Sequence, residues 1–135
     1  MKAALNRVIR QSKPRPFSAG ENLFRQFIEL IESTYPKPRM VSWYADQLHV
    51  TPKYLSTVCR KAGNESASDI IDRYVLKDIN LLMKHSSKSI KEIAYELEFP
   101  NLSFFGKYVK THFGMSPKAY REQMANGNGS QSAQP

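Results

Sequence analysis

The sequence predicts an all-α fold of seven helices. Apolar residues recur at spacings of three and four along most of the chain, and residues that cap helices divide it into helix-sized pieces. No stretch shows the alternation of apolar and polar residues that is typical of a β-strand. With 135 residues, of which 41% are hydrophobic, the chain is large enough for one compact domain or two small subdomains with a real core.

Composition divides the chain into three parts. Residues 1–20 carry five basic side chains, no acid and two prolines, which is typical of a basic linker. Residues 126–135 consist mainly of Gly, Ser, Asn and Gln, and this composition predicts a disordered polar tail. The folded domain is therefore expected over residues 21–125.

Cap residues predict where the helices begin. The first helix is expected from its apolar spacing over residues 23–31, ahead of Pro36. Each later helix opens on a side chain that can accept a hydrogen bond from the free N–H groups of its first turn. These N-cap residues are, in chain order, Ser42, Thr51, Ser66, Ser89, Asn101 and Ser116. Pro52 and Pro117 occupy first helical positions, where a missing N–H costs nothing.

The fourth helix is expected to be the longest. It opens on Ser66, with Asp69 three residues later, and its apolar stripe continues to about Lys84. Some seventeen residues at about 1.5 Å each make it roughly 25 Å long. Ser89 and Glu92 form a second such pair at the start of the fifth helix.

An internal repeat organises these helices. Three small or apolar residues recur at an offset of 49 residues, each time just before a capped helix start. The matching pairs are Ala45 and Ala94, Leu48 and Leu97, and Val50 and Phe99. A small residue lets the next helix cross closely, and the two apolar residues seal the corner, as a helix-turn-helix requires. The sequence therefore predicts two helix-turn-helix subdomains joined by a long linker helix.

The charge of the chain favours a polyanionic partner. Lys and Arg number 20 against 12 Asp and Glu, which gives a net charge of +8. The second helix of each pair lies in a stretch without acids, residues 50–64 and 99–121, where every charged residue is basic. A basic helix whose outward face also carries Ser, Thr and Asn suits the major groove of double-stranded DNA.

The same charge pattern is compatible with two other classes of function. A non-specific or architectural DNA binder would share the positive charge, but it would not need outward Ser, Thr and Asn among the basic residues. A helical protein-interaction module would need an exposed apolar patch, and the expected core accounts for the apolar stripes.

Composition excludes several kinds of site. Cys59 is the only cysteine, and the three histidines lie far apart without carboxylates at ligand spacing, so no metal site is expected. There is no nucleophile–base pair and no phosphate-binding glycine loop, so we expect no enzyme, no cofactor and no small-molecule site. The apolar runs are too short to cross a membrane. A lone thiol fits a reducing cytoplasm, where we expect the protein to act.

Three motifs mark the helix pairs and the start of the last helix. They are residues 43–56 (WYADQLHVTPKYLS), 89–94 (SIKEIA) and 113–121 (FGMSPKAYR). In this order they resemble the DNA-binding domain of the AraC/XylS family of bacterial transcription regulators, and the resemblance covers about residues 23–124. It implies specific binding to double-stranded DNA for transcription regulation. Two recognition helices would enter successive major grooves, about 34 Å apart.

The resemblance also implies which side chains meet DNA. The positions that match base-facing positions of the family are Lys53, Ser56 and Thr57 on the first recognition helix, and Leu102, Ser103, Gly106 and Lys107 on the second. Phosphate contacts are expected from Arg60, Lys61 and Lys110, and from the helix N-termini at Ser42 and Ser89. The aromatic residues beside the turns are expected in the core: Trp43, Tyr44, Tyr54, Phe104 and Phe105.

The sequence departs from the family pattern at the second turn. Glu98 replaces the usual glycine, and a backbone with positive φ there would cost about 1 kcal/mol. Val109 and Ile79 replace a usual phenylalanine and alanine. Family members usually carry a separate ligand-sensing or dimerisation domain ahead of this one. Either the chain is a fragment, with dimerisation left to such a domain, or it acts alone as a monomer on asymmetric sites, and the proline-containing linker favours the fragment. The isolated domain is expected to be a monomer, with RNA polymerase as a further partner.

Overall fold

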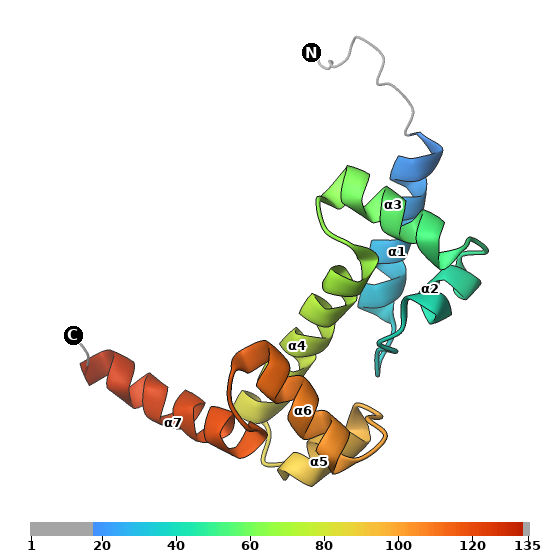
Figure 1. The fold of residues 1–135 in the computed structure, drawn as a ribbon. Coiled ribbons are helices and arrows are strands. Elements are labelled where there is room, and N and C mark those ends of the chain that lie inside the picture. Colours follow the sequence, from blue (N-terminus) through green and yellow to red (C-terminus); the bar gives the residue numbers. More distant parts are fainter. Residues whose placement is uncertain (1–17, 134–135) are drawn as a thin grey trace.

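The computed structural model describes residues 18–133, and seven helices and no strand occur in this part of the chain (Figure 1). They are α1 (Ala19–Ser33), α2 (Val41–Gln47), α3 (Pro52–Gly63), α4 (Ala67–His85), α5 (Ile90–Glu96), α6 (Leu102–Phe113) and α7 (Pro117–Ala133). The predicted all-α fold is confirmed. Most of the predicted basic linker, residues 1–17, lies outside the described residues.

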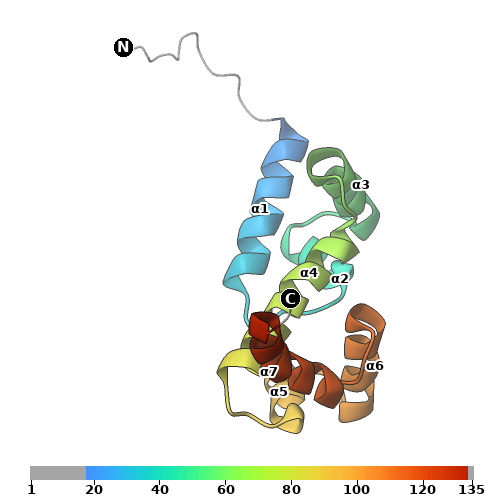
Figure 2. The same ribbon diagram turned by 90° about the vertical axis from the view of Figure 1, so that its left-hand side faces the viewer.

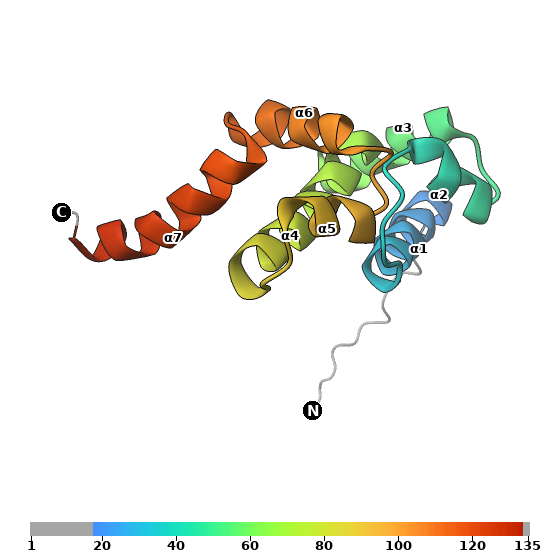
Figure 3. The ribbon, with the colours of Figure 1, turned by 90° about the horizontal axis from the view of Figure 1, so that it is seen from below.

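α4 connects two groups of helices (Figure 1). α1, α2 and α3 pack against its first part, and α5 and α7 pack near its end, with α6 resting on both of these helices. In the two other views α3 and α6 lie on the same side of the molecule (Figures 2 and 3). α7 extends away from the other helices, as Figures 1 and 3 show. This arrangement confirms two helix-turn-helix subdomains, α2–α3 and α5–α6, joined by a long helix.

One apolar core runs along α4. The buried residues of this helix recur mostly at spacings of three and four, so they form a stripe that faces the neighbouring helices. They are Ala67, Ile70, Ile71, Val75, Ile79 and Met83. Ile79 and Val109 both depart from the family pattern, and both are fully buried. The core therefore accommodates the two departures.

Side-chain caps form at helix starts that the sequence predicted. Ser89 Oγ accepts from the N–H of Glu92 at 3.0 Å, and the Glu92 carboxylate accepts from the N–H of Ser89 at 2.7 Å, which completes a capping box. The other side chains that accept from the third residue of their helix are Thr51, Ser66, Asn101 and Ser116. Five of the six predicted N-caps are confirmed in this way.

Two helices begin earlier than predicted. α1 begins inside the predicted linker, because Ser18 and Glu21 form a capping box. α2 begins at Val41, and its N-cap is Met40, which makes no side-chain cap bond, so Ser42 is not the N-cap. Val41 packs against the core. We attribute the earlier start to this burial, which outweighs the local preference for a serine cap.

α7 is longer than predicted. It continues to Ala133, through residues that were expected to form a disordered tail. Once a helix is nucleated, each further residue adds a hydrogen bond, and no proline follows Pro117 before the last residue of the chain. The predicted tail is therefore wrong for residues 126–133, and the last two residues lie outside the described part.

The two turns share one hydrogen-bonded geometry. The N–H of Val50 donates to Ala45 O at 3.0 Å, and the N–H of Phe99 donates to Ala94 O at 2.9 Å. This bond is typical of a Schellman motif, in which the residue before the donor adopts a left-handed conformation. These left-handed residues are His49 (φ 61°) and Glu98 (φ 62°). The repeat seen in the sequence thus consists of the residues that close each turn.

Glycine at either turn is expected to stabilise the fold. Left-handed backbone costs a non-glycine residue about 1 kcal/mol, so His49→Gly and Glu98→Gly should each raise the free energy of unfolding by up to about 1 kcal/mol. Urea unfolding followed by circular dichroism measures this change. Lys91→Gly, at an exposed position inside α5, is the control and should cost about 0.5–1 kcal/mol. Lower stability in both turn variants would contradict the role given to backbone strain.

A largely buried ion pair joins the α1–α2 connection to α4. Lys37 Nζ lies 3.2 Å from Asp78 Oδ2, with the two side chains 8% and 17% exposed. The same nitrogen donates to Thr34 O at 3.0 Å. Asp78 Oδ2 lacks a hydrogen bond of good geometry. The lysine charge is therefore the main compensation for this buried oxygen.

Removing the lysine charge is expected to destabilise the whole domain. Lys37→Met leaves the Asp78 carboxylate buried without a counter-charge, which should lower the free energy of unfolding by about 3 kcal/mol. Lys37→Met/Asp78→Leu removes both charges and should recover most of the loss. Thermal and urea unfolding of the two variants provide the measurement. Equal stability of Lys37→Met and the wild type would show that the pair is not needed.

Candidate nucleic-acid interface

α3 and α6 are the second helices of the two pairs, and each is held by one apolar face. α3 buries Leu55 and Cys59, and α6 buries Phe105 and Val109. Because Pro100 adds one residue after the second turn, the offset between matching residues becomes 50, which aligns Leu55 with Phe105 and Cys59 with Val109. The opposite faces of the two helices therefore match as well, and both are open.

Most of the predicted base-reading residues are exposed on these open faces. The exposed ones are Lys53 and Thr57 on α3, and Leu102, Ser103 and Lys107 on α6. Ser56 and Gly106 occupy matching positions and are half-buried. A Cβ added at Gly106 would have no neighbour within 4 Å. Packing therefore does not require glycine at this position, which leaves room for an approaching ligand.

The predicted phosphate ligands lie at helix ends. Arg60, Lys61 and Lys110 are exposed in the last turns of α3 and α6. Ser42 is exposed in the first turn of α2. The N–H of Ser89 is already bound to Glu92, and this hydrogen bond lowers the pKa of the Glu92 carboxyl. Ser89 therefore has a carboxylate beside it, and Ser42 is the better placed of the two serines.

Two aromatic rings that were expected in the core are exposed instead. Tyr54 and Phe104 are each 46% exposed, and they occupy the third positions of α3 and α6. Their neighbours Leu55 and Phe105 face the core, and adjacent residues of a helix do not share a face. Alignment of the two helices at an offset of 50 would have shown this. The other aromatic residues of that prediction are buried or half-buried: Trp43, Tyr44 and Phe105.

α6 is fixed to α4 through its inner face. The Tyr108 hydroxyl donates to Asp72 Oδ1 at 2.6 Å, and His112 Nε2 lies 3.8 Å from Asp72 Oδ2. Burial raises the pKa of Tyr108 far above its usual value, and the hydrogen bond to Asp72 raises it further. The hydroxyl therefore stays protonated and keeps donating. This bond helps to set the direction in which α6 presents its outer face.

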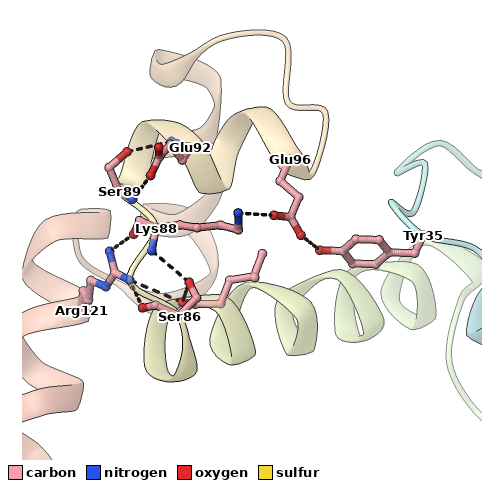
Figure 4. A network of polar contacts seen from close by, with 8 residues as sticks. Tyr35, Ser86, Lys88, Ser89, Glu92, Glu96 and Arg121 are labelled. Carbon is pink, nitrogen blue, oxygen red and sulfur yellow. Dashed lines mark hydrogen bonds and ion pairs between the residues drawn. The ribbon is translucent and has the colours of Figure 1, made fainter.

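The Tyr-Arg pair of the last motif binds the end of α4. The Tyr120 hydroxyl donates to Asn80 Oδ1 at 2.7 Å. The Arg121 guanidinium donates to the carbonyl oxygens of Ser86 and Lys88 at 2.9 and 2.6 Å (Figure 4). Nε of the same group donates to Met83 O, in the last turn of α4, at 3.0 Å. The last carbonyl groups of a helix have no partner within the helix, so this bond satisfies one of them, and the other two bonds hold the chain between α4 and α5. This motif is therefore structural.

The described part of the chain offers little support for a metal site, a membrane span or a reactive thiol. Residues 18–133 contain no cluster of three or more potential metal ligands. None of the seven helices there is long and apolar enough to cross a membrane. Cys59 is fully buried, and burial raises the pKa of its thiol to about 11. The thiol is therefore protonated and poorly reactive at neutral pH.

Comparison with known proteins identifies the family. A helix-turn-helix domain family matches residues 44–123, which is more than half of the chain and includes both turns. The chain belongs to the AraC-type helix-turn-helix family. The resemblance seen in the three sequence motifs is thereby confirmed.

Relatives of this AraC-type domain differ from it in sequence, and those with solved structures share its fold. The Msm operon regulatory protein of Streptococcus mutans is 30% identical over 109 residues, which are 81% of this chain and 39% of that protein. A transcriptional regulator with an AraC-type domain from Chromobacterium violaceum has a TM-score of 0.62 at 20% identity, over 76% of this chain and 91% of that one. The DNA-binding domain of AdpA, in complex with a target DNA, has a TM-score of 0.65 at 15% identity, over 76% and 94%.

Proposed function

We propose that this AraC-type domain binds specific double-stranded DNA in transcription regulation, with α3 and α6 in successive major grooves. The observation that carries the proposal is the position of α3 and α6 on one side of the molecule, where their exposed charges are all basic (Figure 2). Two basic helices on one side can follow one face of a duplex. The AdpA domain, which has the same fold, is in complex with a target DNA, and this supports DNA as the ligand of the present domain.

Base reading is assigned to the first two turns of each recognition helix. Lys53 and Lys107 can donate to guanine O6 and N7. Thr57 Oγ1 already donates to Lys53 O at 3.0 Å, so contact with a thymine methyl suits it better than donation to a base. Leu102 suits the same apolar contact on α6. The remaining members of the base-reading set are Ser56, Ser103 and Gly106.

Phosphate contacts are assigned to the helix ends. Arg60 and Lys61 follow the base-reading residues on α3, and Lys110 does so on α6. The N-termini at Ser42 and Ser89 complete the set, with Ser42 as the stronger member. A plot of log affinity against log salt concentration falls, and each phosphate that is neutralised makes its slope more negative by about 0.9. Binding should therefore weaken steeply as salt rises.

The proposed function also implies where the protein acts and which other proteins it meets. Such a regulator works in the bacterial cytoplasm, where it meets the chromosome. RNA polymerase, and a second copy held by a further domain, are the protein partners that suit it. The Streptococcus relative is a regulatory protein, and we assign no enzymatic role to this chain.

Selection of binding sites from random duplex DNA, at two salt concentrations, tests the function directly. The full chain is expected to recover a motif of two half-sites about ten base pairs apart. Affinity for the selected duplex should be nanomolar at moderate salt. Retained DNA without a motif would favour a non-specific binder. No retained DNA at either salt would contradict DNA binding and favour a protein-interaction role.

Single substitutions then separate base reading from phosphate binding. Lys53→Ala and Lys107→Ala should each cost about 1–3 kcal/mol on the selected duplex and relax the base preference in one half-site. Lys61→Ala should weaken binding to all duplexes alike and reduce the salt slope by about 1. Fluorescence anisotropy with a labelled duplex measures these effects. Lys84→Ala, exposed in the last turn of α4, removes the same charge elsewhere and serves as the control. An equal loss on every sequence would assign Lys53 to phosphate.

A further inference from the structure

Residues 34–40 connect α1 to α2 and also contact the second helix-turn-helix; we call them the bridging segment. The Tyr35 hydroxyl donates to the Glu96 carboxylate of α5 (Figure 4). The other oxygen of that carboxylate lies 3.3 Å from Lys88 Nζ. A segment that belongs to the first subdomain in sequence is thus tied to the supporting helix of the second.

Arg39 of the bridging segment contacts the second turn itself. Its guanidinium carbon lies 3.9 Å from the centre of the Phe99 ring and 5.8 Å from that of Phe104. Nη1 also donates to Leu97 O at 3.5 Å. Phe99 closes the turn, and Phe104 stands exposed on the recognition helix. One side chain therefore touches both the turn and the start of α6.

The bridging segment is also anchored at its own subdomain. The hydroxyl of Tyr44, which is fully buried, donates to Pro38 O at 2.8 Å, and its ring packs edge-on against Phe27. Lys37 holds the middle of the segment on α4 through its ion pair with Asp78. The segment thus has fixed contacts on both sides of the joint between the two helix pairs.

We propose that the bridging segment locks the second helix-turn-helix in one orientation relative to the first, with Arg39 as the positioning residue. α4 alone provides a single connection, and long helices bend gently. The bridging segment adds a separate connection across the same joint, from α2 to α5 and the second turn. With two connections, the second helix-turn-helix is less free to rotate relative to the first than it would be with α4 alone.

The consequence of the lock for DNA binding rests on the proposed function. Two linked modules gain affinity from each other only if both reach their sites at once. A pair held in the bound arrangement beforehand loses less conformational freedom on binding. A locked pair of recognition helices should therefore favour one spacing between half-sites, whereas a loose pair would tolerate several.

The main alternative is that Arg39 binds a DNA phosphate itself. Its side chain is half-buried, and its guanidinium lies against the buried ring of Phe99. Lysine would keep the charge but would lose the planar group that stacks on the ring. Arg39→Lys therefore separates the two roles: it should behave like Arg39→Ala if stacking matters, and like the wild type if charge matters.

The first test measures, without DNA, how firmly the two helix pairs are held relative to each other. Spin labels at Lys61→Cys on α3 and Thr111→Cys on α6, both exposed positions, report the distribution of distances between the two helices in the full chain. Cys59 can stay in place, because it is fully buried and its thiol resists labelling. The width of the distribution measures how firmly the two subdomains are held.

The lock variant is Arg39→Ala/Tyr35→Phe, and its distance distribution should broaden. The matched control is Arg73→Ala/Tyr74→Phe, which also removes one guanidinium group and one tyrosine hydroxyl. The carboxylate partners of Arg73 and Tyr74 belong to the first subdomain or to the chain just before α4. The control distribution should therefore stay as narrow as that of the wild type.

The second test uses three duplexes: the selected site, the same site with its second half scrambled, and the site with three base pairs inserted between the halves. On the selected site the lock variant should lose affinity by roughly tenfold or more. On the single half-site it should bind as the wild type does. The insertion should weaken the wild type more than it weakens the lock variant.

Each result decides for or against the proposal. An unchanged distance distribution in the lock variant would overturn it, whatever happens on DNA. Equal losses on the selected site and the half-site would also overturn it, as would full affinity in Arg39→Lys, because both would assign Arg39 to phosphate. If selection yields no motif, the proposed function fails, and the spin labels still show whether the segment fixes the joint.

Discussion

Three polar side chains on α4 hold the parts of the molecule in place. The three pairs are Asp72 with Tyr108 of α6, Asp78 with Lys37 of the bridging segment, and Asn80 with Tyr120 of α7. All six side chains are at least half-buried. A buried polar group without a partner costs about 1–3 kcal/mol, and charged groups cost more. Each neighbouring element is therefore restricted to the placement in which its partner on α4 is satisfied, which apolar packing alone would not specify.

The same contacts help to explain how the positive charge is distributed. Several acids of the chain bind internal partners, as Glu32 binds Tyr74 and Glu96 binds both Tyr35 and Lys88. α3 and α6 contain no acid, so their exposed basic residues have no counter-charge on their own helix. The acids thus contribute to contacts within the fold, and their absence from α3 and α6 leaves the outer faces of these two helices basic. A net charge of +8 would be less effective for DNA if it were spread evenly.

Local signals made most of the fold predictable, and contacts between distant residues account for most of what was missed. The Schellman turns were found because Ala45 and Val50 repeat as Ala94 and Phe99, and a turn needs only nearby residues. The start of α2 was missed because packing of Val41 overrides a serine cap. The candidate helices followed from the same repeat and the family motifs. Arg39 was missed because its partners lie about sixty residues away, beyond any periodicity of the chain.

Glu98 shows how such a contact changes the meaning of a residue. Judged from the sequence, an acid in place of glycine at the second turn has two costs. A non-glycine residue is unfavourable in a left-handed backbone conformation, and a negative charge is repelled by DNA phosphates. In the folded chain Glu98 lines a groove together with Arg39 and Lys37. Burial lowers the pKa of the Arg39 guanidinium, and the negative charge of Glu98 is among the interactions that oppose this shift. The charge of Glu98 therefore favours the charged form of the arginine that contacts the second turn. An acid that is unfavourable beside DNA thus has a favourable interaction within the fold.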